Sequence, residues 1–114
     1  MQYIENIKGK DYFTTELNAS KCKGYKGLIE EFSLAFSILS NVPNSNVPNF
    51  NVLNDYLTGL EWIEQKNYKL IIKNMNKVEK NRNDYEQFFS IIEHLETHWE
   101  NEENDFIIEL WVIL

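Results

Sequence analysis

A short apolar segment near the middle of the chain, Tyr68-Lys-Leu-Ile-Ile72, constrains the fold more than any other feature. A strand this rich in apolar residues is typical of the interior of a parallel sheet, which is buried on both faces. Amphipathic stretches lie on either side of it, at residues 27–40 and 84–100. Strands that alternate with helices favour right-handed crossovers and a small parallel sheet with helices packed against it.

Both amphipathic stretches carry apolar residues at helical spacing. In the first they are Leu28, Ile29, Phe32, Ala35, Phe36 and Leu39, and in the second Tyr85, Phe88, Phe89, Ile92, Leu95 and Trp99. A third, shorter helix is predicted over 50–58, after the Asn- and Pro-rich loop 41–49. Its expected inward residues are Phe50, Leu53 and Leu57, with Asn49 as N-cap and Gly59 as a left-handed C-terminal cap.

The remaining segments complete the predicted topology. Residues 2–7 and 106–114 are expected to be strands, the first ending in a turn at 8–10, and 74–82 is expected to contain a short helix. Residues 11–26 show no clear period and are predicted to be irregular. The sequence thus predicts one α/β domain, 1–114, with three parallel strands in the order β-α-α-β-α-β.

Composition bounds the class of protein. A chain of 114 residues is one domain, and its single cysteine cannot form an intramolecular disulfide. The N-terminus lacks the apolar segment of a secretory signal, and the longest apolar run, at 106–114, is interrupted by Glu109 and far too short to cross a membrane. We therefore expect a cytoplasmic protein in a reducing compartment.

Charge is distributed unevenly along the chain. The net charge of −7 comes from the last third, because residues 83–114 hold nine acidic and no basic side chains. A surface of this sign repels phosphate backbones and attracts cations, so it argues against a nucleic-acid ligand. It favours a basic protein partner, or serves solubility alone.

The residues that could support catalysis have no suitable neighbours in the sequence. His94 and His98 share a helix face, but Glu96 does not directly follow the first histidine, as a zinc-protease base must. No further histidine exists as a third ligand, which leaves Cys22 or a carboxylate. Cys22 lies among lysines that would lower its pKa, without an evident partner, and the four glycines form no phosphate-binding loop. We therefore expect that the chain is not an enzyme and that it binds neither a metal nor a cofactor.

Two polar helix surfaces remain as candidate binding sites. Asn51, Asp55 and Thr58 should project from one face of the short helix, away from its apolar stripe. On the long helix a ridge of carboxylates is predicted, formed by Glu86, Glu93, Glu96 and Glu100. Either surface could simply be solvated, yet like charges on one helix face destabilise it slightly. A partner that binds the ridge would explain why several carboxylates lie on one helix face.

The segment Asn49-Phe-Asn-Val-Leu-Asn-Asp-Tyr-Leu-Thr-Gly59 resembles the second helix of the barstar family of intracellular ribonuclease inhibitors. Trp62, the strand at 68–74, the long helix and the C-terminal strand follow in the same order. The resemblance covers 28–114, whereas residues 11–26 are longer than the corresponding connection. It implies a three-stranded parallel sheet and an inhibitor that blocks a nuclease active site with an acidic helix.

The resemblance also implies site residues. Asp55 matches the central aspartate that meets the basic residues of the nuclease, and Thr58 and Gly59 match contacts at the end of that helix. A glutamate of the last helix also contributes, for which Glu93 and Glu96 are candidates. Departures from the pattern are Asn51 at an acidic position, Leu60 at an aromatic one, and Asn44-Ser-Asn-Val47 in a Tyr-rich loop. These changes leave the identity of the partner open.

The leading hypothesis is an immunity protein, monomeric when free, that inhibits a basic nuclease toxin. The first alternative is a module with the same fold that binds a regulatory or adaptor protein. The second is a metal-dependent hydrolase using the two histidines, His94 and His98.

Overall fold

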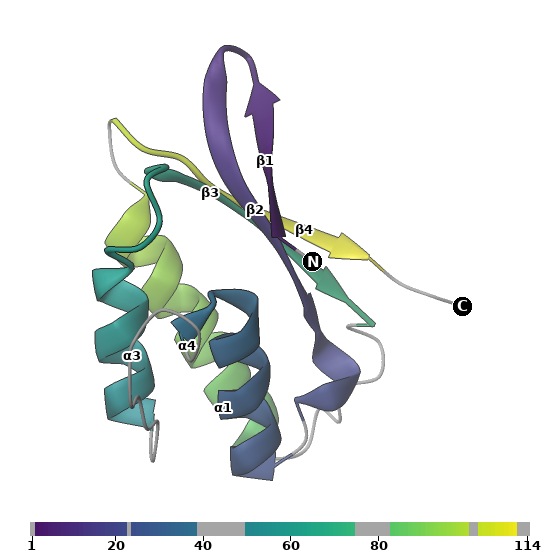
Figure 1. Cartoon of the computed structure of the whole chain (residues 1–114). Coiled ribbons are helices and arrows are strands. Elements are labelled where there is room, and N and C mark those ends of the chain that lie inside the picture. Colours follow the sequence, from purple (N-terminus) through teal and green to yellow (C-terminus); the bar gives the residue numbers. More distant parts are fainter. Residues whose placement is uncertain (1, 23, 39–49, 75–82, 101–102, 112–114) are drawn as a thin grey trace.

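Helices cover one face of a four-stranded sheet in the computed structural model of the chain (Figure 1). The structure describes residues 2–22, 24–38, 50–74, 83–100 and 103–111. Its strands are β1 (Gln2–Ile7), β2 (Lys10–Asn18), β3 (Asn67–Lys73) and β4 (Phe106–Trp111). Its helices are α1 (Gly24–Ala35), α3 (Phe50–Gly59) and α4 (Asn83–Trp99), with a single 3₁₀ turn, η1 (Ala19–Lys21), after β2.

The sheet is mixed, in the order β1-β2-β3-β4. Strands β2, β3 and β4 run parallel, whereas β1 pairs antiparallel with β2 through a hairpin whose turn includes Lys8 and Gly9, both at positive φ. The α/β class is therefore confirmed, but the predicted three-stranded, all-parallel sheet is wrong. Residues 2–7 form an added antiparallel edge strand, and the first parallel strand is β2, in the segment predicted to be irregular.

Two buried threonines explain why the sequence pattern does not reveal β2 as a strand. Thr14 and Thr15 are polar but 0% and 1% exposed, so the strand lacks a simple alternation of apolar and polar residues. Each hydroxyl has a partner: Thr15 donates to the carbonyl of Ala35 at 2.6 Å, and Thr14 to a carboxylate oxygen of Glu5 at 3.4 Å. Hydrogen bonding removes most of the cost of burying these groups.

Helix α1 begins earlier and ends earlier than predicted. It spans Gly24–Ala35 rather than 27–40, and Ser37 then adopts a positive φ of 55° that is incompatible with continuing the helix. Near its start, a Cβ at Gly27 would lie 2.6 Å from the carbonyl oxygen of Lys21, so only glycine allows α1 to pack this closely on η1. Helices α3 and α4 and strand β3 match their predicted ranges within about one residue. The predicted loop 41–49, most of the helix at 74–82, and 112–114 lie outside the described residues.

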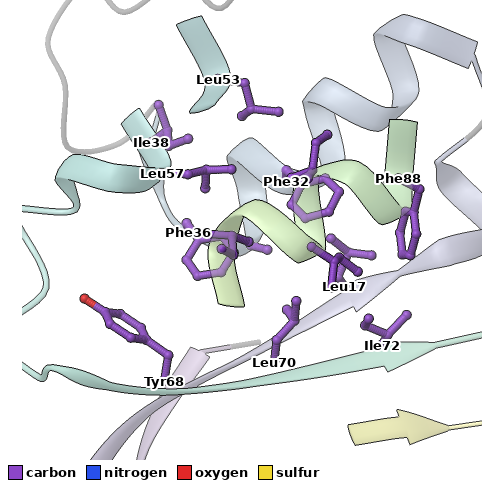
Figure 2. Packing of buried hydrophobic residues seen from close by; sticks show 14 of the residues in the cluster. Leu17, Phe32, Phe36, Ile38, Leu53, Leu57, Tyr68, Leu70, Ile72 and Phe88 are labelled. Carbon is purple, nitrogen blue, oxygen red and sulfur yellow. The ribbon is translucent and has the colours of Figure 1, made fainter. Parts of the chain in front are cut away.

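The hydrophobic core lies between the helices and the sheet (Figure 2). Alternate residues of β2 and β3 point toward the helices, because successive side chains of a strand face opposite ways. Fully buried apolar side chains come from every layer: Leu17, Leu70 and Ile72 from the sheet, Leu28 and Phe32 from α1, Phe36 and Ile38 after it, Leu53 and Leu57 from α3, and Phe88 from α4.

The open face of the sheet is crossed by ion pairs. Lys69 of β3 bridges Glu5 of β1 at 3.2 Å and Glu109 of β4 at 3.1 Å, and Lys73 pairs with Glu16 at 2.9 Å. The hydrogen bond to Glu109 raises the pKa of Lys69, Glu5 adds to this effect, and burial opposes it. Two lysines thus offset part of the charge of three carboxylates on this face.

One buried hydroxyl in the core has no hydrogen-bond partner among the described residues. Tyr68 is 1% exposed, and its ring stacks obliquely on Trp99 with centroids 4.9 Å apart, but its Oη is unpaired. Burial raises the pKa of this phenol to about 12. An unsatisfied buried polar group destabilises the folded state by about 1–3 kcal/mol.

Replacing Tyr68 with phenylalanine should therefore leave the free energy of unfolding at pH 7 unchanged or raise it by about 1 kcal/mol.

The same substitution should change how stability depends on pH. The pKa of the tyrosine is about 10 in the unfolded chain and about 12 in the folded one, so the folded state keeps the proton to higher pH. The contribution of this group to stability is complete below pH 10 and falls by about 1.4 kcal/mol per pH unit as the pH rises to 12. Urea titrations at pH 7 and pH 11 should show a smaller alkaline loss for Tyr68→Phe than for the parent. An equal loss in both would contradict the assignment.

Candidate functional site

The exposed face of α3 carries the residues predicted to bind a partner. Asn51 and Asp55, one turn apart, are both exposed, while Leu53 and Leu57 on the opposite face are 0% exposed. A helix whose inner face is fixed in the core presents its outer side chains on a rigid base. Asn51 and Asp55 therefore occupy the face the sequence predicted for them.

The end of α3 differs from the prediction. Gly59 is the last helical residue, and the left-handed position is taken by Leu60, with a φ of 36° and its N–H donating to the carbonyl of Tyr56 at 3.1 Å. Leu60 is 0% exposed, so its burial offsets the roughly 1–2 kcal/mol that this backbone conformation costs a non-glycine residue. Gly59 as a left-handed cap is thus wrong.

Gly59 leaves open space at the end of the helix. A Cβ built there would meet no atom within 4 Å, so the folded chain has no steric need for glycine at this position. Beside it, Thr58 is half-buried and donates its hydroxyl hydrogen bond to the carbonyl of Asp55 at 3.0 Å. The last turn of α3 is therefore stabilised by its own hydrogen bond, and a partner can approach it at Gly59 without steric hindrance.

The predicted acidic residues of α4 lie on a neighbouring helix. The indole N–H of Trp99, the last residue of α4, donates to the carbonyl of Leu57 at 2.9 Å and joins the last turns of the two helices. Glu93 is exposed, and Glu96, within one turn of Trp99, is half-buried. The structure thus gathers Asn51, Asp55, Thr58 and Gly59 on α3, with both candidate glutamates on the adjoining helix.

Asp55 differs from Asp105 in its electrostatic surroundings. Asp105 accepts hydrogen bonds from the Tyr12 hydroxyl and from Lys10, and these lower its pKa, the Tyr12 bond having the larger effect. The same bond raises the pKa of Tyr12 to about 12. Asp55, by contrast, forms no ion pair with any described residue. Its charge is available to a ligand.

The features that suggested catalysis do not form a site in the described chain. His94 and His98 are exposed on α4, and among the described residues no three His, Cys, Asp or Glu side chains lie close enough to hold a metal. Cys22 is buried, and desolvation, with a smaller effect of Glu31, raises its pKa to about 12. The predicted lowering of that pKa is wrong, because burial of the thiol disfavours the thiolate. No helix in the described ranges has the length and apolarity needed to span a bilayer.

The structure also has a groove close to the end of α3, which was not predicted from the sequence. It has a volume of about 390 Å³ and lies between β1 and the connection from α3 to β3. Trp62 and Ile63 line one side, and Gln2 and Ile4 line the other. The aromatic residue at 62 is the available signal in the sequence, but its neighbours depend on β2, which lies mostly in the segment 11–26 that was predicted to be irregular.

Comparison of the sequence with known families relates this architecture to other proteins. Residues 12–111 match the model of the family described as Barstar (barnase inhibitor). The chain belongs to the barstar family. Members of the barstar family are ribonuclease inhibitors rather than enzymes, and they bind a ribonuclease as a partner protein. The match begins inside β2, so β1 lies outside the matched residues. Neither the curated proteins nor the solved structures give a match to this chain.

Proposed function

We propose that this barstar-family protein is an immunity protein that inhibits a nuclease toxin by inserting the exposed face of α3 into the toxin active site. The observation that carries the proposal is the placement of Asp55. Its carboxylate is exposed, it has no ion-pair partner among the described residues, and its helix is fixed by Leu53 and Leu57 in the core. The proposal places the protein in the cytoplasm, where the toxin would act.

The chemistry of a nuclease site suits a carboxylate on a rigid helix. Such sites use Arg, Lys and His to hold a phosphate, and a carboxylate satisfies the same donors through charge-assisted hydrogen bonds. Because a carboxylate offers no bond to cleave, it occupies the site without reacting. Asn51 and Thr58 add uncharged hydrogen-bonding groups, and the open space at Gly59 lets the partner backbone approach.

Of the two glutamates on α4, Glu96 is the better candidate for a second contact. It lies within one turn of Trp99, where α4 is joined to α3, whereas Glu93 lies nearly a turn farther from that junction. Glu96 is also half-buried, so less side-chain entropy is lost when a partner fixes it. We therefore assign the α4 contact to Glu96, with Glu93 at the margin.

Charge distribution supports a basic partner. Residues 83–114 contribute nine acidic side chains and no basic ones. Two of the nine, Asp105 and Glu109, are paired with Lys10 and Lys69, so the excess negative charge comes from the others. Opposite net charges accelerate encounter, and added salt slows it.

The decisive experiment is an inhibition assay with the nuclease encoded beside this gene. We expect one equivalent of the purified protein to suppress RNA or DNA cleavage, with an association rate that falls by about tenfold or more between low and high salt. Stopped-flow fluorescence measures the rate, and a substrate-cleavage assay measures inhibition. Full cleavage in the presence of excess protein would exclude the proposed function, and binding without inhibition would favour a partner-binding module.

A further inference from the structure

We infer that the groove between β1 and the α3–β3 connection is a second partner subsite, which receives an arginine or lysine side chain of the nuclease. The inference rests on the proposed function and extends it to a region outside the family match. Strand β1, which supplies one wall, precedes residue 12, where that match begins. A contact here would distinguish this protein's partner from those of relatives that share only the matched region.

The composition of the groove fits a long basic side chain. Four of the residues that line it are apolar, namely Ile4, Phe13, Trp62 and Ile63. Its polar groups are the Glu64 carboxylate, the amides of Gln2 and Gln65 and the Ser37 hydroxyl, and none of the residues lining it is basic. Arginine and lysine bury their aliphatic stems on apolar surface while the charged head reaches a polar rim, and arginine also stacks on indole rings. A carboxylate at the rim completes that arrangement.

Both walls are held by the same stretch of backbone. Gln2 donates through Nε2 to the carbonyls of Leu34 and Ala35, at 3.0 and 2.8 Å. On the other side, the indole N–H of Trp62 donates to the carbonyl of Phe36 at 2.8 Å. Both walls are thus fixed to the end of α1 before any partner arrives, which reduces the entropy lost on binding.

The groove is close enough to α3 for one partner to cover both. Trp62 follows Gly59 by three residues, so their Cα atoms are at most about 11 Å apart even in an extended chain. A standard interface covers about 800 Å² on each partner, a patch roughly 30 Å across, which is well over twice this distance. If a second copy of the chain bound along β1 instead, two molecules that each carry a net charge of −7 would come together. Charge therefore favours the basic partner.

The test uses neighbouring residues of β1 that face opposite ways. Ile4 is 52% exposed and lines the groove, whereas Tyr3 is 40% exposed and points to the other face of the sheet. Both Ile4→Lys and Tyr3→Lys add one positive charge, so both change long-range attraction equally. We expect Ile4→Lys to raise the Kd for the nuclease of the inhibition assay by about tenfold, and Tyr3→Lys to leave it within about twofold. Isothermal titration calorimetry at fixed salt measures both.

A second pair of variants tests the groove without relying on Ile4→Lys, which could affect folding. Glu64 and Glu61 are exposed in the same connection, but only Glu64 lines the groove. Glu64→Gln should weaken binding about threefold or more, and Glu61→Gln less than twofold. Equal effects within each pair, with binding still dependent on Asp55, would overturn the subsite and leave the proposed function intact. Absence of Asp55-dependent nuclease binding would overturn both.

Discussion

Replacing Asp55 with alanine is expected to raise the Kd for the nuclease by about thirtyfold or more, which corresponds to about 2 kcal/mol of binding free energy. The reason is geometric as well as electrostatic. Asp55 is the acidic residue on the exposed face of α3, and no described cation competes for it. The basic groups of a nuclease site left facing alanine would lose a charge-assisted partner in a desolvated interface.

The same substitution should barely affect the fold. Asp55 is exposed, so the free energy of unfolding is expected to change by less than about 0.5 kcal/mol in urea titrations. Glu30→Ala on α1 is the matched control, because it also removes one exposed helical carboxylate. It should change the Kd by less than about twofold, an effect of net charge alone. Similar Kd values for both variants would show that Asp55 lies outside the interface.

The largest loss of stability is expected for Trp99→Ala, at about 3–5 kcal/mol. Trp99 is 8% exposed, stacks obliquely on Tyr68 and donates its indole hydrogen bond to Leu57, so one side chain holds α3, α4 and β3 together. Truncation leaves a cavity and an unpaired buried carbonyl, whereas Trp99→Phe retains much of the volume and loses mainly the hydrogen bond. We expect the phenylalanine variant to lose about 1–3 kcal/mol.

Urea unfolding followed by tryptophan fluorescence and circular dichroism measures these differences. Because the Trp99 hydrogen bond also sets α3 against α4, Trp99→Phe should weaken nuclease binding modestly even where the protein stays folded. Equal stabilities of the parent and the alanine variant would show that this contact does not join the helices.

The sequence was sufficient to predict the elements whose hydrophobic period is strong. Helix α4 and strand β3 were predicted within about one residue, because the stripe from Phe88 to Trp99 and the segment 68–72 have only one good burial solution. The exposed face of α3 followed from the spacing of Leu53 and Leu57 for the same reason.

Features that depend on tertiary contacts could not be predicted in this way. Strand β2 was overlooked because Thr14 and Thr15 are buried with hydrogen-bond partners that come from β1 and α1. The left-handed position fell on Leu60 instead of Gly59 because burial of the leucine overrides the local preference for glycine. The groove beside Trp62 could be found only once β1 was placed, and the proposed preference for Glu96 over Glu93 depends on the Trp99 contact.

The mixed sheet also has a kinetic consequence. The β1–β2 hairpin joins residues adjacent in sequence, and hairpins form in about 1–10 μs. The parallel pairs are remote, since Tyr12 pairs with Asn67 and Tyr68 with Phe106, and each requires a long loop to close before any contact compensates the lost entropy. Folding should therefore be slower than in a helical bundle of equal length. The hairpin offers the late-arriving β3 an already ordered edge on which to pair.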